Sequence, residues 1–343
     1  MKYNGRQVVK VSKATPVGGG LLAIGDYSQL EIFIAAILSG EQKLLDALAS
    51  GDDIHAWVAS QIFPELKGLS IKEIKKNHKL ARSKSKQVSF GILYQKKPTT
   101  AEMETVYELF FNTFTSLKKW VDDTKQFCKE NGYVETPFGR FRKLPDAKLT
   151  DRRDLGLINA ALRRAVNSPI QSTASDCAFI ACVTIDYLLE KLKMKSQFLG
   201  GVHDSIIVDA YPGETFEVCE VMKHATTELT HDFMHGFRLN FDMGIGHSWG
   251  RQLEIKKEWS ENGRRFYLLE GGDIDFVYLK RELTIGYGNK LKYENVELGD
   301  DIEYESRVHD WVPQSKKQIS VIISVPEFNI DFSAIEKEII YGN

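Results

Sequence analysis

The sequence predicts an α+β fold, in which helices and strands occupy separate stretches of the chain. Three observations support this prediction: a short apolar run at residues 21–27, helical spacing of apolar residues over most of residues 71–193, and alternating β-branched and aromatic residues after residue 250. With 343 residues, 43% of them hydrophobic, the chain is long enough for one large or two ordinary domains with buried cores.

Composition narrows the class of protein. The net charge is -2, but residues 1–250 carry 32 Lys and Arg against 29 Asp and Glu, whereas residues 251–343 carry 13 against 18. The sequence has no signal-peptide core and no run of about 18 apolar residues. The four cysteines show no CxxC spacing, which is typical of a reducing cytosol and argues against structural zinc. We therefore expect a soluble, cytoplasmic protein that does not bind membranes.

The first predicted elements place an acidic residue at the end of a strand. Residues 21–27 (LLAIGDY) are typical of a buried strand, and the QLEIFIAAIL that follows has helical periodicity. Asp26 is therefore expected at a strand-to-helix junction.

Long helices and one hairpin follow. Residues 71–95 and 101–130 are predicted to be amphipathic helices, broken at residues 96–98 and closed by Asn131-Gly132, and helix dominates again from about 151 to 193. In FLGGVHDSIIVDA, residues 198–210, Gly200-Gly201 is a turn signal between two apolar stretches. This hairpin is expected to present a second acid, Asp204, at or near its turn.

Residues 251–343 have a different pattern. DIDFVYLKRELTIGYG and QISVIISVPEF alternate as strands do, with turns expected at Gly271-Gly272 and Gly286. We expect a β-rich module that is either a docking surface for another chain or a lineage-specific decoration. Its acidity argues against direct binding of nucleic-acid phosphates.

Two acids far apart in the sequence, Asp26 and Asp204, each follow a short apolar strand. Such a pair can jointly coordinate two divalent metal ions, which activate a hydroxyl group and neutralise the charge on a triphosphate during phosphoryl transfer. A single Asp at such a position is more often a helix N-cap or a turn residue. Spacing alone leaves both interpretations open.

Short motifs around these acids narrow the choice. DYSQLE (26–31), RSKSKQVSFGILY (82–94) and VHDS (202–205) resemble motifs A, B and C of family A DNA polymerases, in the order of that family. DIHAWVA, ENGYVETPFGRFRKLPD, RRAVNSPIQSTASD and GHSWG resemble further landmarks, so the resemblance covers about residues 6–250. It implies a right-hand polymerase palm with an antiparallel sheet and helical fingers within residues 1–250, the fingers at about 65–150.

The motif at residues 82–94 also has a physical logic of its own. Arg82, Lys86, Phe90 and Tyr94 are spaced by four, so they form a drifting stripe on one face of a helix. Two cations followed by two aromatic rings would hold a triphosphate at one end and stack on a base and sugar at the other. The alternative is a solvated basic helix with a buried aromatic end.

The resemblance implies roles for individual residues. Two Mg²⁺ ions would be held by Asp26, Asp204 and the backbone carbonyl of Tyr27. The incoming dNTP would be contacted by Gln29, Glu31, Arg82, Lys86, Phe90 and Tyr94. In this set Glu31 is the steric gate against ribonucleotides, Lys86 protonates the leaving pyrophosphate, and Phe90 influences sugar discrimination.

The resemblance also implies contacts with the DNA primer-template, by Arg163, Asn167, Gln171 and His203. Two of these have structural alternatives. Asn167 could be a local cap before Pro169, and His203 could be a packed turn residue.

The sequence departs from the family in two places. Ser205 stands where motif C usually has a second acid, a pattern that also resembles the His-Asp-Ser of single-subunit RNA polymerases. Only about 25 residues precede Asp26, so we expect a second polypeptide, as in a split phage polymerase, to supply the thumb and the exonuclease.

The predicted function is template-directed addition of dNMP to a primer 3′-hydroxyl with release of pyrophosphate. Two alternatives stay open: a non-catalytic polymerase-like subunit that binds DNA in replication, and a relative of the single-subunit RNA polymerases. Retention of Asp26, Arg82, Lys86 and Asp204 together favours an enzyme. The residues at the Glu31 and Phe90 positions favour DNA synthesis over RNA synthesis.

Overall fold

The computed structural model describes residues 20–51, 53–229, 231–272, 274, 276–301, 317–333 and 335. These residues form two compact units. The sheet unit contains the described residues up to Ser28, Ala178–Leu229, and those from Phe241 onward. The helical unit contains Gln29–Cys177 and residues 231–240.

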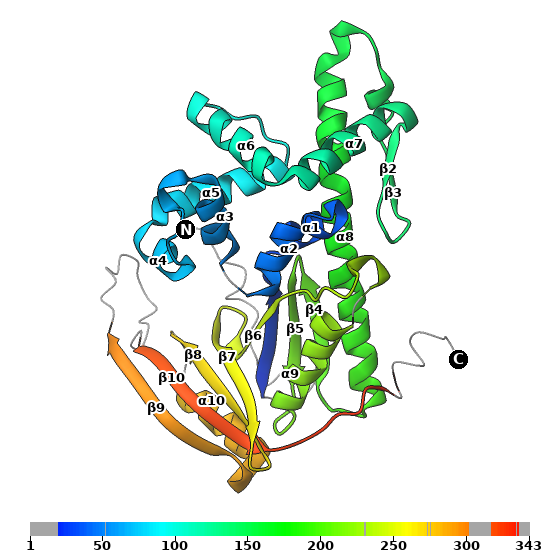
Figure 1. Cartoon of the computed structure of the whole chain (residues 1–343). Coiled ribbons are helices and arrows are strands. Elements are labelled where there is room, and N and C mark those ends of the chain that lie inside the picture. The colour runs from blue at the N-terminus through cyan, green and yellow to red at the C-terminus, as the bar shows by residue number, and fades with distance from the viewer. Residues whose placement is uncertain are drawn as a thin grey trace, which may run out of the picture. The chain divides into compact units, whose positions relative to one another are not determined.

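An eight-stranded sheet is the framework of the sheet unit, and neighbouring strands in it are antiparallel. In spatial order the strands are β4 (Gln197–Val202), β5 (Ser205–Ala210), β1 (Leu21–Tyr27), β6 (Phe241–Ser248), β7 (Arg251–Glu261), β8 (Arg264–Gly271), β10 (Lys317–Pro326) and β9 (Lys292–Asp301). Figure 1 shows β1 inside this sheet, between β5 and β6. The predicted α+β class with an antiparallel sheet is confirmed.

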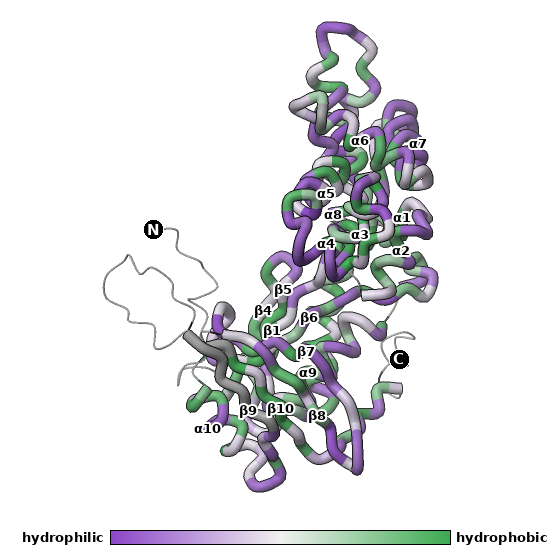
Figure 2. The backbone as a smooth tube through the Cα atoms, turned by 60° about the vertical axis from the view of Figure 1, so that its left-hand side comes forward, coloured by the Kyte–Doolittle hydropathy of each residue, from purple (hydrophilic) through white to green (hydrophobic). Residues whose placement is uncertain are grey.

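Strand β1 lies between β5 and β6 in the interior of the sheet, and nearly all of its residues are buried. On one face, Leu22 and Ile24 form a buried apolar cluster with Ile207 of β5, and Trp249 packs against this cluster. Hydrophobic stretches run along these strands in Figure 2. Since side chains alternate along a strand, Asp26 projects to the same face as Leu22 and Ile24. The acid is therefore held at the end of a rigid, buried strand.

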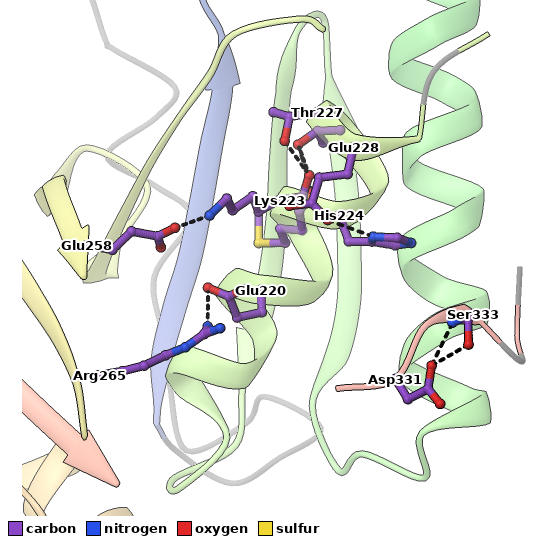
Figure 3. Close-up of polar contacts among 11 residues, drawn as sticks. Glu220, Lys223, His224, Thr227, Glu228, Glu258, Arg265, Asp331 and Ser333 are labelled. Carbon is purple, nitrogen blue, oxygen red and sulfur yellow. Dashed lines mark hydrogen bonds and ion pairs between the residues drawn. The ribbon is translucent and has the colours of Figure 1, made fainter. Parts of the chain in front are cut away.

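The residues after 250 continue this sheet and also pack on α9 (Thr215–Lys223). Phe216 of α9 stacks on the fully buried Tyr267 of β8, with ring centroids 4.3 Å apart. Two ion pairs, drawn in Figure 3, join α9 to the adjoining strands: Glu220 with Arg265 at 2.7 Å, and Lys223 with Glu258. The β content expected of this region is present, and its strands extend the sheet of β1.

Helices make up most of the helical unit. Its described helices are α1 (Leu30–Ser39), α2 (Gln42–Ala49), α3 (Ile54–Ile62), α4 (Ile71–Asn77), α5 (Lys79–Leu93), α6 (Ala101–Thr113) and α7 (Thr115–Asn131), and a hairpin is formed by β2 (Tyr133–Glu135) and β3 (Phe141–Lys143). Helix α8 (Leu155–Lys191) begins in this unit and ends in the sheet unit. Short 3₁₀ or π turns lie at Pro64–Leu66, Pro145–Lys148, Arg152–Asp154, His224–Glu228, Asp232–Met234 and Gly288–Lys290.

The helical run Arg152–Lys191 is long and apolar enough to cross a membrane by length and composition alone. Its most apolar stretch is 56% buried inside the fold, which is the behaviour of a core helix. No second helix of that kind occurs in the part of the chain that the structure describes.

The predicted hairpin at residues 198–210 exists with His203 and Asp204 at its turn, as predicted, but the two glycines do not make that turn. Gly200 and Gly201 lie inside β4, where the register with β5 is irregular, and the chain turns at His203 and Asp204. His203 has a φ angle of 59°, so a left-handed residue makes the turn that the glycines were expected to make. A Cβ atom on Gly201 would lie 2.8 Å from a cysteine sulfur of α8, so close packing explains this glycine.

The strand predicted from DIDFVYLKRELTIGYG was wrong, because Phe276–Tyr287 forms helix α10. Its buried residues, Leu279, Glu282 and Leu283, are spaced three and four apart, as on a helix face. The two-residue alternation covered only the start of the segment. Gly286 lies in this helix and not at the predicted turn, and a Cβ atom there would meet the backbone of Gly213 at 1.9 Å.

Each of the two long helices predicted in residues 71–130 is a pair of helices. The chain breaks at His78, between α4 and α5, and at Phe114, between α6 and α7. Phe114 is fully buried and packs edge-on against Phe110, with ring centroids 4.6 Å apart. Tertiary packing therefore decides the second break, which no glycine or proline marks.

Candidate active site

Three neighbouring strands bring Asp26, Ser205 and Asp242 side by side. Asp26 pairs with Ser205 between β1 and β5, and with Asp242 between β1 and β6. Directly opposite residues of antiparallel strands project to one face, with Cβ atoms about 4.5–5.5 Å apart. The buried Ser205 donates its hydroxyl to Asp26, and Ser28 donates to Asp242. The end of β1 therefore carries a row of one serine and two carboxylates.

The turn between β4 and β5 is tied to the same end of β1. The backbone N–H of Tyr27 donates to the carbonyl oxygen of Asp204, at 3.1 Å. Asp204 itself is half-buried, and His203 beside it is exposed. The structure thus brings together Asp26, Tyr27 and Asp204, predicted from two separate motifs, at one end of the sheet.

The chemistry of this end of the sheet suits a hard divalent cation. Asp26 and Asp204 supply carboxylate oxygens and Tyr27 a carbonyl oxygen, which are the donors that Mg²⁺ prefers. Among the described residues, no three His, Cys, Asp or Glu side chains form a group that could hold one ion. Since Mg²⁺ keeps several waters and binds substrate phosphates, two carboxylates and a carbonyl are enough. The residues present therefore fit magnesium.

Helix α5 carries the predicted stripe of cations and aromatic rings. Its Ser85 is buried against α3 and donates its hydroxyl to the carbonyl oxygen of His55 at 2.5 Å. Lys86 is exposed, and the side chain of Phe90 lies outside what the structure describes. Tyr94 comes one residue after the end of α5, so it belongs to the following turn.

Asp53 is a partner of Arg82 that the sequence analysis did not identify. The Arg82 guanidinium donates from Nε to both carboxylate oxygens of Asp53, at 2.9 and 3.0 Å, and from Nη2 to Oδ2 at 2.7 Å. Asp53 also caps α3 by accepting from the N–H of Ala56 at 2.9 Å. Burial by itself raises the pKa of Asp53, but its hydrogen bonds with Arg82 and Ala56 hold that pKa below the ordinary 3.8. The position of Asp53 directly before a helix is typical of a capping residue. No feature of the neighbouring sequence indicates that Asp53 pairs with Arg82.

Glu31, Tyr94 and Gln171 meet in the helical unit. The Tyr94 hydroxyl donates to the two carboxylate oxygens of Glu31 at 2.9 and 2.8 Å. The side-chain amide of Gln171 on α8 approaches Glu31 at 3.4 Å. Burial and the neighbouring Glu31 raise the pKa of Tyr94. Residues expected in three different roles therefore form one hydrogen-bonded group.

Gln29 occupies the position before α1 with a left-handed φ angle of 59°. Its backbone carbonyl accepts from the N–H groups of Ile32 and Phe33, both at 3.1 Å. Its side-chain oxygen is buried and has no hydrogen-bond partner among the residues that the structure describes. A buried amide oxygen without a partner is uncommon, and a ligand donor would satisfy it.

Arg163 on α8 lines a basic cavity of about 290 Å³ in the helical unit. The charged side chains around it are Lys96, Lys97, Lys118, Lys125, Asp122 and Arg163. Burial lowers the pKa of Lys125. One turn along α8, Asn167 is half-buried, and Gln171 after it is exposed. An excess of cations in a cavity of this size favours phosphate groups.

The predicted site residues divide between the two units. Asp26, Tyr27, His203 and Asp204 belong to the sheet unit, and the predicted nucleotide-binding residues with Arg163, Asn167 and Gln171 belong to the helical unit. Two residues that sequence reasoning missed, Asp53 and Asp242, lie one in each unit. Asp242 has no local signal at all, because only the pairing of β6 with β1 brings it next to Asp26.

Known proteins resemble this chain over most of its length. The family model described as DNA polymerase family A matches residues 2–251. A DNA polymerase of Bacillus phage SP01 is 30% identical over 310 residues, which cover 85% of this chain and 32% of that protein. DNA polymerase I of Mycobacterium leprae is 30% identical over 238 residues, 67% of this chain and 25% of that protein. The chain thus spans about a third or less of the length of these relatives.

Solved structures are also similar to this chain, and one of them contains bound ligands. The POL domain of Pol1 from M. smegmatis, in complex with DNA primer-template and dNTP, has a TM-score of 0.62 and 27% sequence identity. The match covers 73% of this chain and 43% of that chain. The phage polymerase matches 85% of the chain, more than residues 2–251 make up, so that likeness extends into the region after residue 251.

Proposed function

Because the chain belongs to DNA polymerase family A, we propose that it catalyses template-directed DNA synthesis, adding dNMP to a primer 3′-hydroxyl with release of pyrophosphate. The fold predicted from its motifs, a polymerase palm with helical fingers, is confirmed by the likeness to the M. smegmatis POL domain. The proposed substrates are a DNA primer-template and dNTPs, the ligands named for that domain.

The joint position of Asp26 and Asp204 at one end of the sheet carries the proposal. Together with the carbonyl of Tyr27, they are assigned to two Mg²⁺ ions. When bound, the ions would activate the 3′-hydroxyl and neutralise charge that develops on the triphosphate. The chain's own task is to hold these oxygens in place, and the hydrogen bond from Ser205 orients Asp26 for it.

Arg82 and Lys86 are assigned to the triphosphate. A guanidinium has five N–H donors in a rigid fork, and Asp53 engages only the Nε and Nη2 edge. Asp53 therefore acts as the residue that orients Arg82 for phosphate. Lys86, four residues further along α5, is exposed and supplies a cation that can protonate the leaving pyrophosphate. Gln29 and Phe90 complete the proposed nucleotide contacts.

Glu31 is assigned to sugar selection. The hydrogen bonds from Tyr94 fix its carboxylate, and a fixed side chain excludes a 2′-hydroxyl more strictly than a mobile one. Tyr94 is further assigned to stacking near the templating base and to the closing movement of the fingers. Such a movement would have to break its hydrogen bonds with Glu31. Sugar selection and closure are therefore coupled in this proposal.

Primer-template contacts are assigned to Arg163, Asn167, Gln171 and His203. The basic cavity next to Arg163 supports a role in holding backbone phosphates. The boundaries of palm and fingers, residues 1–250 with fingers at about 65–150, stay predictions, as do a separate role for residues 251–343 and a cytoplasmic location. A second polypeptide with thumb and exonuclease also stays a prediction.

Primer extension by the purified chain tests the proposal. The assay uses a DNA primer-template, the four dNTPs and Mg²⁺, and compares the wild type with Asp26→Ala and Asp204→Ala. The matched control is Asp123→Ala, which removes an exposed carboxylate of α7 that the proposal does not use. We expect extension by the wild type and the control, and none by the other two variants.

The alternatives make different predictions in the same assay. A non-catalytic DNA-binding subunit would bind the primer-template without extending it, with or without added polypeptides. A split polymerase would extend only after a thumb-bearing chain is added, and its Asp204→Ala variant would stay inactive. An RNA polymerase relative would prefer ribonucleotides. Extension that survives Asp204→Ala would refute the assigned catalytic role.

A further inference from the structure

Asp242 of β6 is an acid beside the proposed metal site to which no motif gives a role. We propose that it supplies the second carboxylate next to Asp26, in place of the acid that motif C usually has where this chain has Ser205, and that it acts on the ions through their bound water. This inference rests on the proposed function. It makes Asp242 a positioning residue, since it acts through water and through Asp26.

The register of β6 on β1 is what places Asp242. Tyr27 pairs with Phe241, and their rings meet edge to face with centroids 4.9 Å apart. A Cβ atom on Gly25 would lie 2.0 Å from the Phe241 ring, so this ring packs directly against the backbone of Gly25. Because a slip of one residue would move every β6 side chain to the other face, this packing keeps Asp242 on the face of Asp26.

The two neighbours of Asp26 differ in charge and in exposure. Ser205, on β5, is 1% exposed and neutral, and it already donates its hydroxyl to Asp26. Asp242, on β6, is exposed and accepts from Ser28. A carboxylate in contact with solvent keeps its hydration, whereas an acid at the buried position 205 would lose it. The chain therefore carries the extra charge on the solvated side of Asp26.

Magnesium chemistry explains how such a residue acts without direct ligation. Mg²⁺ loses its water reluctantly, so carboxylates around it commonly hold metal-bound water. Outer-shell partners of this kind typically change metal affinity by about 10- to 100-fold when they are removed.

Manganese binding to the full chain tests the inference without relying on activity. Electron paramagnetic resonance measures free Mn²⁺ in titrations of the wild type, Asp242→Asn, Asp242→Glu, Asp26→Asn and the control Asp123→Asn. We expect affinity to fall about 10-fold in Asp242→Asn, to fall further in Asp26→Asn, and to stay unchanged in Asp242→Glu and the control. Adding Ser205→Glu to Asp242→Asn should restore part of the lost affinity, because an acid at the buried position 205 supplies the charge but loses hydration.

The outcomes separate this inference from the proposed function. Wild-type affinity in Asp242→Asn, with weak binding in Asp26→Asn, would overturn the role of Asp242 alone. Unchanged affinity in Asp26→Asn as well would remove the metal site itself. A folded double variant that binds no better than Asp242→Asn would show that position 242 does not stand in for position 205. If that variant does not fold, Asp242→Glu decides, because a residue needed for its charge must tolerate this change.

Discussion

Replacing Asp53 separates two contributions to the stability of the helical unit. Its carboxylate caps α3 through the N–H of Ala56 and holds the Arg82 guanidinium through contacts of 2.7 to 3.0 Å. Asp53→Asn keeps an amide oxygen that can cap the helix but removes the charge. Asp53→Ala removes both. The two variants therefore measure the ion pair and the cap separately.

The magnitudes follow from exposure and from the number of contacts. A hydrogen bond to a charged group contributes about 1.5–3 kcal/mol. The Arg82 side chain is 32% exposed, against 11% for Asp53, so water will partly solvate Arg82 once its partner is neutral. We therefore expect the low end, about 1.5 kcal/mol, for Asp53→Asn. Loss of the cap adds about 1 kcal/mol, which gives about 2.5 kcal/mol for Asp53→Ala.

The pH dependence has a definite sign. The folded pKa of Asp53 lies below its ordinary value of 3.8, so the stabilisation is fully present above 3.8 and is lost as the pH falls through the folded pKa. The difference in unfolding free energy between the wild type and Asp53→Asn should be constant at neutral pH. It should shrink only in strong acid, below pH 3.8.

Hydrogen exchange read out by mass spectrometry gives the local free energies that this prediction needs. Peptides from α3 and from the first turns of α5 should exchange about 10-fold faster in Asp53→Asn, the factor that corresponds to about 1.4 kcal/mol. Peptides from β7 and β8, in the other unit, are the internal control. Equal exchange in Asp53→Asn and the wild type would refute the reasoning, because the pair with Arg82 would then contribute nothing. A difference that vanishes already at pH 6 would refute the lowered pKa.

Single contacts elsewhere predict equally specific outcomes. Tyr94→Phe removes the hydrogen bonds that fix Glu31, so competition between rNTPs and dNTPs in primer extension should show more ribonucleotide incorporation, by up to about tenfold; an unchanged ratio would uncouple the two residues. Tyr267→Ala removes a fully buried ring stacked on Phe216 and should cost about 3–5 kcal/mol in urea unfolding of the sheet unit. A cost under about 1 kcal/mol would mean that β8 packs only loosely on α9. Burial raises the pKa of Cys177 to about 12, and all four cysteines are free and buried, so Ellman's reagent at pH 8 should modify them only after unfolding.

Local patterns in the sequence predicted the elements that carry the motifs. The strand at residues 21–27 has the predicted bounds, and the helix after it begins within one residue of the prediction. Both predictions rest on the apolar residues of this segment, whose pattern changes from a continuous run in the strand to helical spacing directly after it. The helix expected from about 151 to 193 is α8, because apolar residues recur through most of this segment at the spacing of a helix.

The errors arose where tertiary contacts outweigh local signals. Helix α10 begins with an alternating stretch that favours a strand, but burial of Leu279 and Leu283 inside the sheet unit favours a helix. Gly201 looked like a turn residue, yet a neighbouring side chain and not the backbone angle explains it. Asp53 and Arg82 stand 29 residues apart, and only the packing of α3 against α5 makes them partners.

The separate role predicted for residues 251–343 stays a prediction. Their described strands extend the sheet, since β7 pairs with β6, and β6 carries Asp242 next to Asp26. The ion pairs between α9 and these strands act on the helix that also packs on β1. The described strands after residue 250 therefore flank β6, the strand that carries Asp242.

The serine in motif C shows why a sequence motif alone can misjudge a site. In the sequence alone, Ser205 replaces the second acid of motif C, and such a replacement would weaken metal handling without abolishing it. Read across the sheet, Asp26 has two neighbours, and the one on β6 is an acid. An electrostatic field at a metal depends on where charges lie and not on which strand supplies them. If manganese affinity depends on Asp242 and is restored by an acid at position 205, the two positions are alternatives for one charge, and a serine in this motif is no sign of an inactive polymerase.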